Sequence, residues 1–365
     1  MLTTKDQVVR EIALASLGEA IRGRIKQAPT SDEIARYLSG DCTGVFLGPS
    51  GTGTSVWSYA RNAARRQRER LKVRWRWCEK KGEMAVECNG KGGAGKGGGL
   101  VIVPPRARSQ IIYRLRVAGQ NYYLDSLLSK KDQGKVYALA SVDRASNHFL
   151  RNGSFTRFAD WRFVHRARLD VLPLNGARRW GDQQDTRCRR CGYTNETLSH
   201  VLNNCGPHMV AITKRHDATV QRIVKNAKLP GEIILNKSAP EADAGCSLLR
   251  PDIVIRDERS KTVTIIDVAI PFENGLDAFR VAKEHKLQKY QPIADSLQEK
   301  GYKVYLKAFI LGALGTWDRD NWAVIKHLPI GKRYAGLMMK LMVFDTIRWS
   351  RDIYVEHVSG QRQYS

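Results

Sequence analysis

Apolar residues recur with a helical period through the first 40 positions of the chain. They stand every four or five residues, at Val8, Ile12, Leu17, Ile21 and Ile25. This spacing predicts an amphipathic helix. Ser31 is the expected N-cap of a second, shorter helix that runs through Tyr37, and 57–81 is expected to form one arginine-rich helix.

A strand pattern appears after residue 247. The run 248–255 is typical of a strand that carries Asp252, and 262–270 is typical of a second strand with Asp267 near its end. Because only the polar turn 257–261 separates them, the two strands are expected to pair as an antiparallel hairpin.

The hairpin is followed by a helical and then a strand pattern. Residues 276–299 predict a long helix, which Pro292 could bend, and 303–311 predict a further strand. Lys286 and Lys289 lie three residues apart, so they share one face of this helix.

The charge balance points to a polyanionic partner. The chain holds 61 Lys and Arg against 36 Asp and Glu, a net charge of +25 over 365 residues. Phosphate contacts by such a chain release condensed counterions, which favours nucleic-acid binding. No apolar run approaches the roughly 20 residues that span a bilayer, so no membrane partner is expected. The Gly-rich run 48–55 has Thr54 where a phosphate-binding loop needs lysine, which excludes nucleotide hydrolysis there.

The basic residues are concentrated in two places. The segment 61–81 contains ten basic residues and two acidic ones, and a second Arg-rich stretch precedes Cys188. A solvated charged face would show the same local pattern, but the net charge of the whole chain favours contact with phosphates. The candidate nucleic-acid-binding residues are Arg61, Arg65, Arg66, Arg68, Arg70, Arg74, Arg76, Arg178 and Arg179.

Three of the seven cysteines share one short window with a histidine. Cys188 and Cys191 are separated by two residues, and His200 and Cys205 follow with four residues between them. The first pair forms a tight turn, and a helix over 196–204 would direct the other two ligands toward it. Three thiolates and one imidazole make a closed tetrahedral set, which predicts a structural Zn²⁺ site, a zinc knuckle.

The two strand-borne aspartates have the chemistry of a nuclease centre. Carboxylates on adjacent strands can hold Mg²⁺ or Mn²⁺, which activates water and neutralises charge on a phosphodiester. A lysine beside them stabilises the transition state. No lysine stands two positions after Asp267, so Lys286 or Lys289 on the following helix must supply the ammonium. The alternative is a salt-bridged pair of aspartates at the edge of the core.

These motifs together resemble a known family. The relevant segments are 147–151, 165–180, the knuckle, Arg250-Pro251-Asp252, Ile266-Asp267-Val268, Lys286 to Tyr290, Trp317-Asp318, 345–350 and 354–357. They look like site-specific non-LTR retrotransposons of the ribosomal-DNA-targeting type, which carry a restriction-like endonuclease. The resemblance covers most of the chain from about residue 140 and is weaker before it. It implies that Asp252 and Asp267 are metal ligands, that Lys286 or Lys289 is the catalytic lysine, and that the protein acts in the nucleus on target double-stranded DNA and element RNA.

The expected fold is α+β, with a restriction-endonuclease-like C-terminal domain of the Pro-Asp…(Asp/Glu)-x-Lys type. The expected parts are a helical, thumb-like basic region (1–88), a Gly/Lys-rich linker and mixed segment (89–140), a basic linker (141–187), the knuckle (188–208) and the endonuclease (209–365). The chain contains no two adjacent aspartates, so the reverse transcriptase palm is expected to be absent. The expected function is Mg²⁺-dependent nicking of target DNA that primes reverse transcription. The alternative is a non-catalytic DNA- or RNA-binding remnant of a decayed element.

Overall fold

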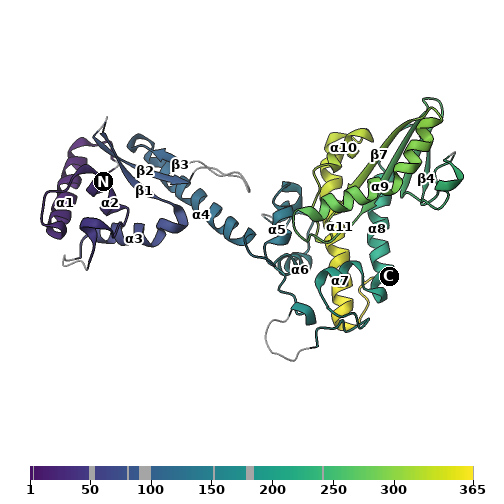
Figure 1. Ribbon diagram of the computed structural model, residues 1–365, viewed down its shortest axis with the longest axis horizontal. Helices are drawn as coiled ribbons and strands as arrows, with labels where there is room; N and C mark the ends of the chain where they lie inside the picture. The colour runs from purple at the N-terminus through teal and green to yellow at the C-terminus, as the bar shows by residue number, and fades with distance from the viewer. Residues whose placement is uncertain are drawn as a thin grey trace. The chain divides into compact units, whose positions relative to one another are not determined.

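The computed structural model describes residues 1–2, 4–48, 54–79, 82–89, 100–150, 153–177, 185–240 and 242–364. Helices and two separate β-sheets make up a mixed α+β architecture (Figure 1). The chain divides into two compact units, Met1–Leu127 and Leu128–Ser365. None of the helices in the described ranges is long and apolar enough to cross a membrane.

The N-terminal unit combines helices with a three-stranded antiparallel sheet of order β1-β2-β3. Leu17 and Ile21 of the first helix are fully buried against Leu38 and Phe46, which confirms the second half of the predicted stripe. Val8 and Ile12 are 63% and 64% exposed, and Ala13 occupies the buried position one turn before Leu17. The elements are α1 (Gln7–Ile25), α2 (Ser31–Leu38), α3 (Val56–Leu71), β1 (Arg74–Cys78), β2 (Glu83–Asn89), β3 (Leu100–Val103) and α4 (Ile111–Leu128).

Two predictions for this unit are wrong in detail. The N-cap of α2 is Thr30, which forms a capping box with Glu33, and not Ser31. The arginine-rich helix ends at Leu71 instead of continuing to residue 81, because Lys72 adopts a left-handed conformation (φ 48°). The strand that follows alternates exposed Arg with half-buried Trp, a period of two that fits a strand and not a helix.

The predicted boundary at residue 88 also falls inside a sheet. β2 pairs with β3 from Val86↔Val103 to Asn89↔Leu100, so the strands on either side of the Gly/Lys-rich run belong to one structure. The region 1–88 is therefore not purely helical. The Gly/Lys-rich residues 90–99 themselves lie outside the described ranges.

The C-terminal unit is built around a four-stranded sheet of order β4-β5-β6-β7. β4/β5 and β5/β6 are antiparallel, whereas β6 and β7 are parallel and are joined through α9. The elements are α5 (Lys135–Ala140), α6 (Phe158–Arg168), α7 (Leu198–Asn203), α8 (Met209–Val224), β4 (Glu232–Leu235), β5 (Ile253–Asp257), β6 (Thr262–Ala269), α9 (Asp277–Glu299), β7 (Lys303–Ile310), α10 (Asn321–His327) and α11 (Lys332–Ser359).

Helices cover both faces of this sheet. On one face, Tyr290, Ile293 and Leu297 of α9 pack against Val254 and Ile265. On the other face, α8 and α11 run side by side (Figure 1) and share one core with the sheet. The antiparallel hairpin is confirmed, and β6 and α9 lie within a residue of their predicted bounds. The first strand begins at Ile253 and not at residue 248, so Asp252 immediately precedes β5 instead of lying within it.

The segment predicted as a basic linker, 141–187, contributes to that core. Phe149 and Phe163 are buried in the same cluster as Ile253 and Ile266 of the sheet. Arg168 is 1% exposed and donates to the Leu314 carbonyl at 2.9 Å. Residues before the knuckle are therefore part of the C-terminal unit and not a spacer.

Candidate functional site

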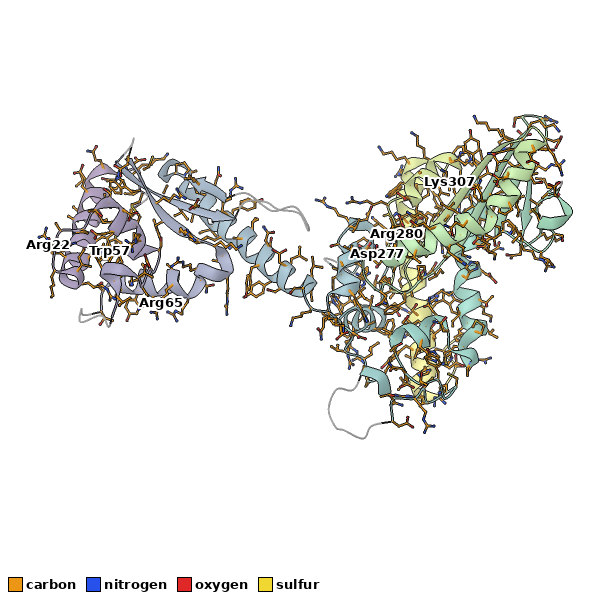
Figure 2. All side chains as sticks on the ribbon, in the orientation of Figure 1. Arg22, Trp57, Arg65, Asp277, Arg280 and Lys307 are labelled. Carbon is orange, nitrogen blue, oxygen red and sulfur yellow. The ribbon has the colours of Figure 1, made fainter. Side chains whose placement is uncertain are left out.

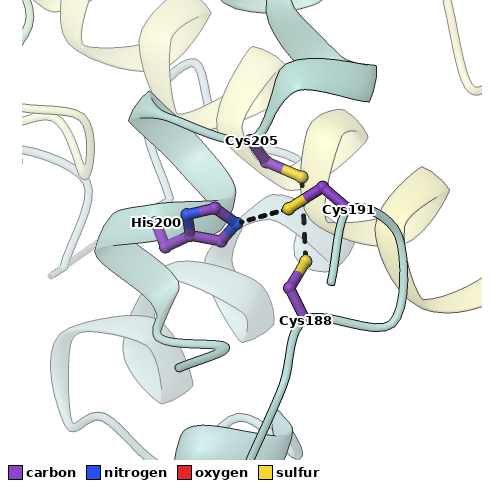
Figure 3. A group of neighbouring side chains, drawn as sticks. All are labelled: Cys188, Cys191, His200 and Cys205. Atoms are coloured by element: carbon purple, nitrogen blue, oxygen red, sulfur yellow. Dashed lines mark hydrogen bonds between the residues drawn. The ribbon is translucent and has the colours of Figure 1, made fainter. Parts of the chain in front are cut away.

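The predicted knuckle residues converge on one point. The ligand atoms of Cys188, Cys191, His200 and Cys205 all lie within 4.8 Å of one another (Figure 3). The Cys191 sulfur is 3.2 Å from His200 Nε2, and the Cys188 and Cys205 sulfurs are 3.8 Å apart. These four side chains could hold a metal ion such as zinc.

Local backbone structure produces this convergence. Gly192 has φ of 73° and donates to the Cys188 carbonyl at 2.9 Å, which closes the turn between the first two cysteines. A left-handed φ is accessible to glycine without a Cβ penalty. His200 follows the N-cap Thr197, whose hydroxyl accepts its backbone N–H at 3.1 Å. Tyr193 stacks on the His200 ring with 4.6 Å between centroids, which fixes the ring plane.

The electrostatics of the cluster suit a cation. Burial, together with the neighbouring Cys188 sulfur, raises the pKa of the Cys205 thiol well above its ordinary range. Burial also lowers the pKa of His200, so its ring is held neutral, which is the form that binds a metal. A divalent ion would compensate the thiolates, because thiolate and not thiol is the liganding form.

Glu196 anchors the knuckle to the rest of the unit. Its carboxylate is fully buried and accepts from the Asn175 backbone at 2.7 Å, from the Arg189 backbone at 2.8 Å and from His357 Nε2 at 2.8 Å. The Arg189 guanidinium donates to it as well, at 2.9 and 2.8 Å. Although burial opposes ionisation, these donors, with Arg189 the strongest, lower the pKa of Glu196 to about 2. Sequence reasoning missed this residue, since its partners lie up to 161 positions away.

The two candidate catalytic aspartates lie side by side at the end of the hairpin. The Asp252 backbone N–H donates to Asp267 Oδ1 at 3.2 Å, and the Val268 N–H donates to Asp252 Oδ2 at 2.7 Å. These reciprocal bonds fix both carboxylates relative to the sheet. Asp252 is 9% exposed and Asp267 is 1% exposed.

Helix α9 directs one of the two candidate lysines to this centre. Lys286 Nζ is 2.6 Å from Asp267 Oδ2. Lys289 is exposed, and its ammonium lies 4.9 Å from the centre of the Tyr290 ring. Tyr290 is buried and donates to the Arg250 carbonyl at 2.9 Å, which holds α9 against the segment that leads to Asp252. The geometry therefore places Lys286, and not Lys289, beside the carboxylates.

A histidine that sequence reasoning left outside the site completes the cluster. His216 of α8 has Nε2 at 3.2 Å from both Asp252 Oδ2 and the Val268 carbonyl oxygen. Although burial favours the neutral ring, the hydrogen bond to Asp252 raises the pKa of His216 to about 9. Two oxygens thus converge on one cationic group. The sequence motif did not include His216, because this residue lies 36 positions before Asp252.

The two carboxyl groups titrate in opposite directions. Burial raises the pKa of Asp267, and the neighbouring Asp252 charge raises it further against the effect of Lys286. Burial acts on Asp252 in the same sense, but its hydrogen bond with His216 and the charge of that ring lower its pKa overall. Two carboxylates that cannot both ionise freely form a centre that a divalent cation would stabilise.

The candidate nucleic-acid-binding arginines do not form one class. Arg61 is buried, donates to the Tyr37 carbonyl at 3.0 Å and to the Asp41 carbonyl, and lies 4.7 Å from the Tyr37 ring centre. Its prediction as a phosphate contact is wrong, because its donors are used inside the unit. Arg76 pairs with Glu87 at 2.7 Å, although its side chain is 57% exposed.

The other arginines of this set are at the surface of α3 and β1, or beyond the described ranges. Arg65 and Arg66 are exposed on α3 and Arg68 is half-buried. Arg70 and Arg74 are exposed as well. Arg178 and Arg179 lie outside the described residues.

Comparison with known proteins finds a partial similarity to a retrotransposon protein. The "Retrovirus-related Pol polyprotein from type-1 retrotransposable element R2" of Popillia japonica is 29% identical to this chain over 216 residues. The match covers 58% of this chain and 44% of that protein, so the chain spans less than half the length of the relative. No protein-family model matches the sequence. This partial similarity supports a relation to non-LTR retrotransposon proteins and a retrotransposon-related role.

Proposed function

We propose that this protein is a Mg²⁺-dependent DNA endonuclease that nicks target DNA for a non-LTR retrotransposon. The observation that carries the proposal is the convergence of Asp252, Asp267 and Lys286 from three separate segments onto one point. Structural ion pairs also bury carboxylates, and here a cationic group stands beside each one, Lys286 at Asp267 and His216 at Asp252. Two adjacent carboxylates on one hairpin still offer the hard oxygen ligands that a divalent ion prefers, and such an ion would take over the neutralising role of the His216 ring.

The architecture supports the same assignment. The order β5-β6-α9-β7 supports a restriction-like nuclease, for which the sequence predicts two strands that carry the aspartates, a helix that carries the lysine and a further strand. The catalytic residues then come from the hairpin and from the helix that follows it. The similarity to a Pol polyprotein of an R2 element is consistent with an enzyme of this kind.

Each side chain has a role in phosphodiester hydrolysis. Asp252 and Asp267 would hold Mg²⁺ through hard oxygen ligands, and the bound ion would supply charge neutralisation and water activation. Lys286 places a second positive charge beside the carboxylates, where it can stabilise charge that develops on the scissile phosphate. Tyr290 and the backbone bonds of the hairpin hold these groups in position.

The remaining parts of the chain would serve placement. Cys188, Cys191, His200 and Cys205 would hold a structural zinc ion, since three thiolates and one imidazole leave no open coordination position. The exposed arginines of α3 and β1 would contact phosphates of target DNA or element RNA. Such a protein would act in the nucleus, where its target lies.

A nicking assay tests the proposal. Supercoiled plasmid with Mg²⁺ should be converted to open circles by the full chain, and Asp252→Asn should lower the rate by about 100-fold or more. Lys286→Met should lose activity to a similar extent, whereas Lys289→Met, the matched control on the same helix, should retain most of it. All variants should still bind DNA in a gel-shift assay.

Two results would contradict the proposal. Undiminished nicking by Asp252→Asn would show that the Asp252 carboxylate is not needed for the reaction. Binding of DNA without nicking by the wild-type chain, in either Mg²⁺ or Mn²⁺, would favour the alternative of a non-catalytic nucleic-acid-binding protein.

A further inference from the structure

The outer face of helix α6 carries aromatic and basic side chains. The inner face of this helix packs into the core of the C-terminal unit through Phe163, Val164 and Ala167. The positions between them recur at helical spacing and form one stripe on the outer face. The members of this α6 stripe are Phe158, Trp161, Arg162, His165 and Arg166.

The rings of the α6 stripe form a short stack that ends in an exposed ring. Phe158 is 72% exposed and lies nearly parallel to Trp161, with 6.0 Å between ring centroids and 15° between the planes. Trp161 in turn contacts the His165 ring edge-on at 4.2 Å. Phe155, three residues before the helix, is 47% exposed and has a left-handed backbone (φ 61°), which bulky residues rarely adopt. Exposed aromatic surface grouped in this way marks an interaction site.

The arginines of the α6 stripe are free to bind an anion. Arg162 and Arg166 are exposed, and neither has an acidic partner within the part of the chain that the structure describes. Asp160, the acidic residue of α6, is 0% exposed and is paired with Arg157 at 2.8 Å and with Arg351 at 3.1 Å. The outer face is therefore positively charged. A guanidinium group binds phosphate through two parallel hydrogen bonds.

The α6 stripe lies close to the knuckle. Burial raises the pKa of Tyr354 on α11, and the nearby charges of Arg166 and of the knuckle residue Arg189 oppose that rise. The stripe belongs to the C-terminal unit, whereas α3, on which Figure 2 labels Arg65, belongs to the N-terminal unit. The α6 stripe is therefore a basic surface of the C-terminal unit in its own right.

We propose that the α6 stripe binds single-stranded nucleic acid, with an unpaired base stacked on Phe158 and neighbouring phosphates held by Arg162 and Arg166. In a duplex, neighbouring bases cover each base face, so only an unpaired base can stack on the ring. From Phe158 to Arg166 the helix rises about 12 Å, the length of about three or four stacked nucleotides. Ring faces and guanidinium groups contact features that RNA and DNA share. Such binding requires neither divalent metal nor cleavage.

The first experiment follows the fluorescence anisotropy of labelled oligonucleotides titrated with the full chain, without divalent metal. The ligands are a single strand of about 12 nucleotides, as DNA and as RNA, and the matching duplex. About 0.3 M salt weakens the phosphate contacts made elsewhere on the chain. Phe158→Ala should weaken binding of both single strands about fivefold or more and change duplex binding by less than about twofold. Phe158→Tyr, which keeps a ring, should retain the wild-type affinity.

Tyr334→Ala is the matched control for the loss of an exposed ring. Tyr334 is 37% exposed in the first turn of α11. It lies 20 residues, or about 30 Å of helix, before Tyr354, where α11 packs against Phe163 of α6. This variant should bind all three ligands as the wild type does. Thermal unfolding of Phe158→Ala should match the wild type, because an exposed ring contributes little to the core.

A second experiment tests the arginines through the salt dependence of single-strand binding. Arg162→Gln together with Arg166→Gln should reduce the log–log salt slope by about 1.4 units, since each phosphate contact on a single strand contributes about 0.7. Lys237→Gln together with Arg259→Gln removes the same charge from exposed positions on other elements of the same unit. This control pair should leave the slope unchanged.

Two results would overturn the proposal. Undiminished single-strand affinity in Phe158→Ala would show that no base stacks on this ring. An equal loss for the single strand and the duplex would show that the surface does not recognise unpaired bases. A wild type that has the expected single-strand selectivity but never nicks DNA would retain this binding site and overturn only the nuclease function.

Discussion

Replacing Glu196 by Gln tests whether this buried carboxylate holds the knuckle to the C-terminal unit. The substitution preserves shape but turns one acceptor oxygen into a donor NH₂. If the new amide nitrogen takes the place of Oε2, the Asn175 backbone N–H and Arg189 Nη2 both face a donor. Two unsatisfied donors cost about 1–3 kcal/mol each, and the Arg189 charge loses its counterion. Because Arg189 is 26% exposed, water recovers part of that loss.

The expected loss in the free energy of unfolding is about 3 kcal/mol. The lowered pKa of Glu196, about 2 against an ordinary 4.5, leads to a similar figure of about 3 kcal/mol. Folding lowers the pKa of this carboxyl, so the ionised group stabilises the folded state. This stabilisation is fully present above the unfolded pKa near 4.5 and is lost as the pH falls through about 2. For a unit of this size the expected shift in Tm is about 6–12 °C.

The assay is urea unfolding of the zinc-loaded full chain at neutral pH, followed by tryptophan fluorescence. Glu299→Gln, an exposed position on α9, is the matched control and should leave the midpoint unchanged. A change below about 0.5 kcal/mol in Glu196→Gln would refute the reasoning, because surface substitutions already span that range. It would mean that water reaches this carboxylate.

Two further predictions concern metal and nucleic acid. Elemental analysis of reduced, freshly purified protein should find one zinc per chain, and Cys191→Ser should lose it; a zinc-free wild type would contradict the knuckle assignment. Changing Arg65, Arg66, Arg68 and Arg70 together to Gln should reduce the log–log salt slope of duplex DNA binding by about three to four units if all four contact phosphate. Arg61→Gln, by contrast, should leave the salt slope of DNA binding unchanged and should destabilise the N-terminal unit in thermal unfolding, because the Arg61 donors serve buried carbonyls. An unchanged salt slope in the quadruple variant would show that the arginines of α3 do not contact phosphate.

The sequence predicted those features that depend on residues close together in the chain. The hairpin that carries Asp252 and Asp267 follows from two apolar runs with a polar turn, and α9 follows from its helical period. The four candidate metal ligands follow from spacing, because a turn and a short helix bring them together.

The features that sequence reasoning missed depend on distant partners. Trp75 and Trp77 were assigned to a helix by their arginine neighbours, yet pairing with β2 makes this segment a strand. The sequence around Phe149 indicates a basic linker. Its apolar side chains are nevertheless buried against a sheet whose strands lie more than 100 residues further along the chain. The choice between Lys286 and Lys289 was left open, because both share a helix face and only the packing of α9 selects one.

The position of His216 connects the two sites through helix α8. This helix begins four residues after Cys205, and His216 lies seven residues, or about 10 Å, further along its axis. Its neighbour Arg215 is 2% exposed and donates to the Leu202 carbonyl of α7 and to Ser350 Oγ of α11, each at 2.9 Å. Rotation or sliding of α8 would break these bonds in a close-packed interior, so the α7 end of the helix determines where His216 meets Asp252. A structural zinc that orders Cys205 and α7 would therefore also set the position of the His216 ring beside Asp252, although none of its ligands touches the carboxylates.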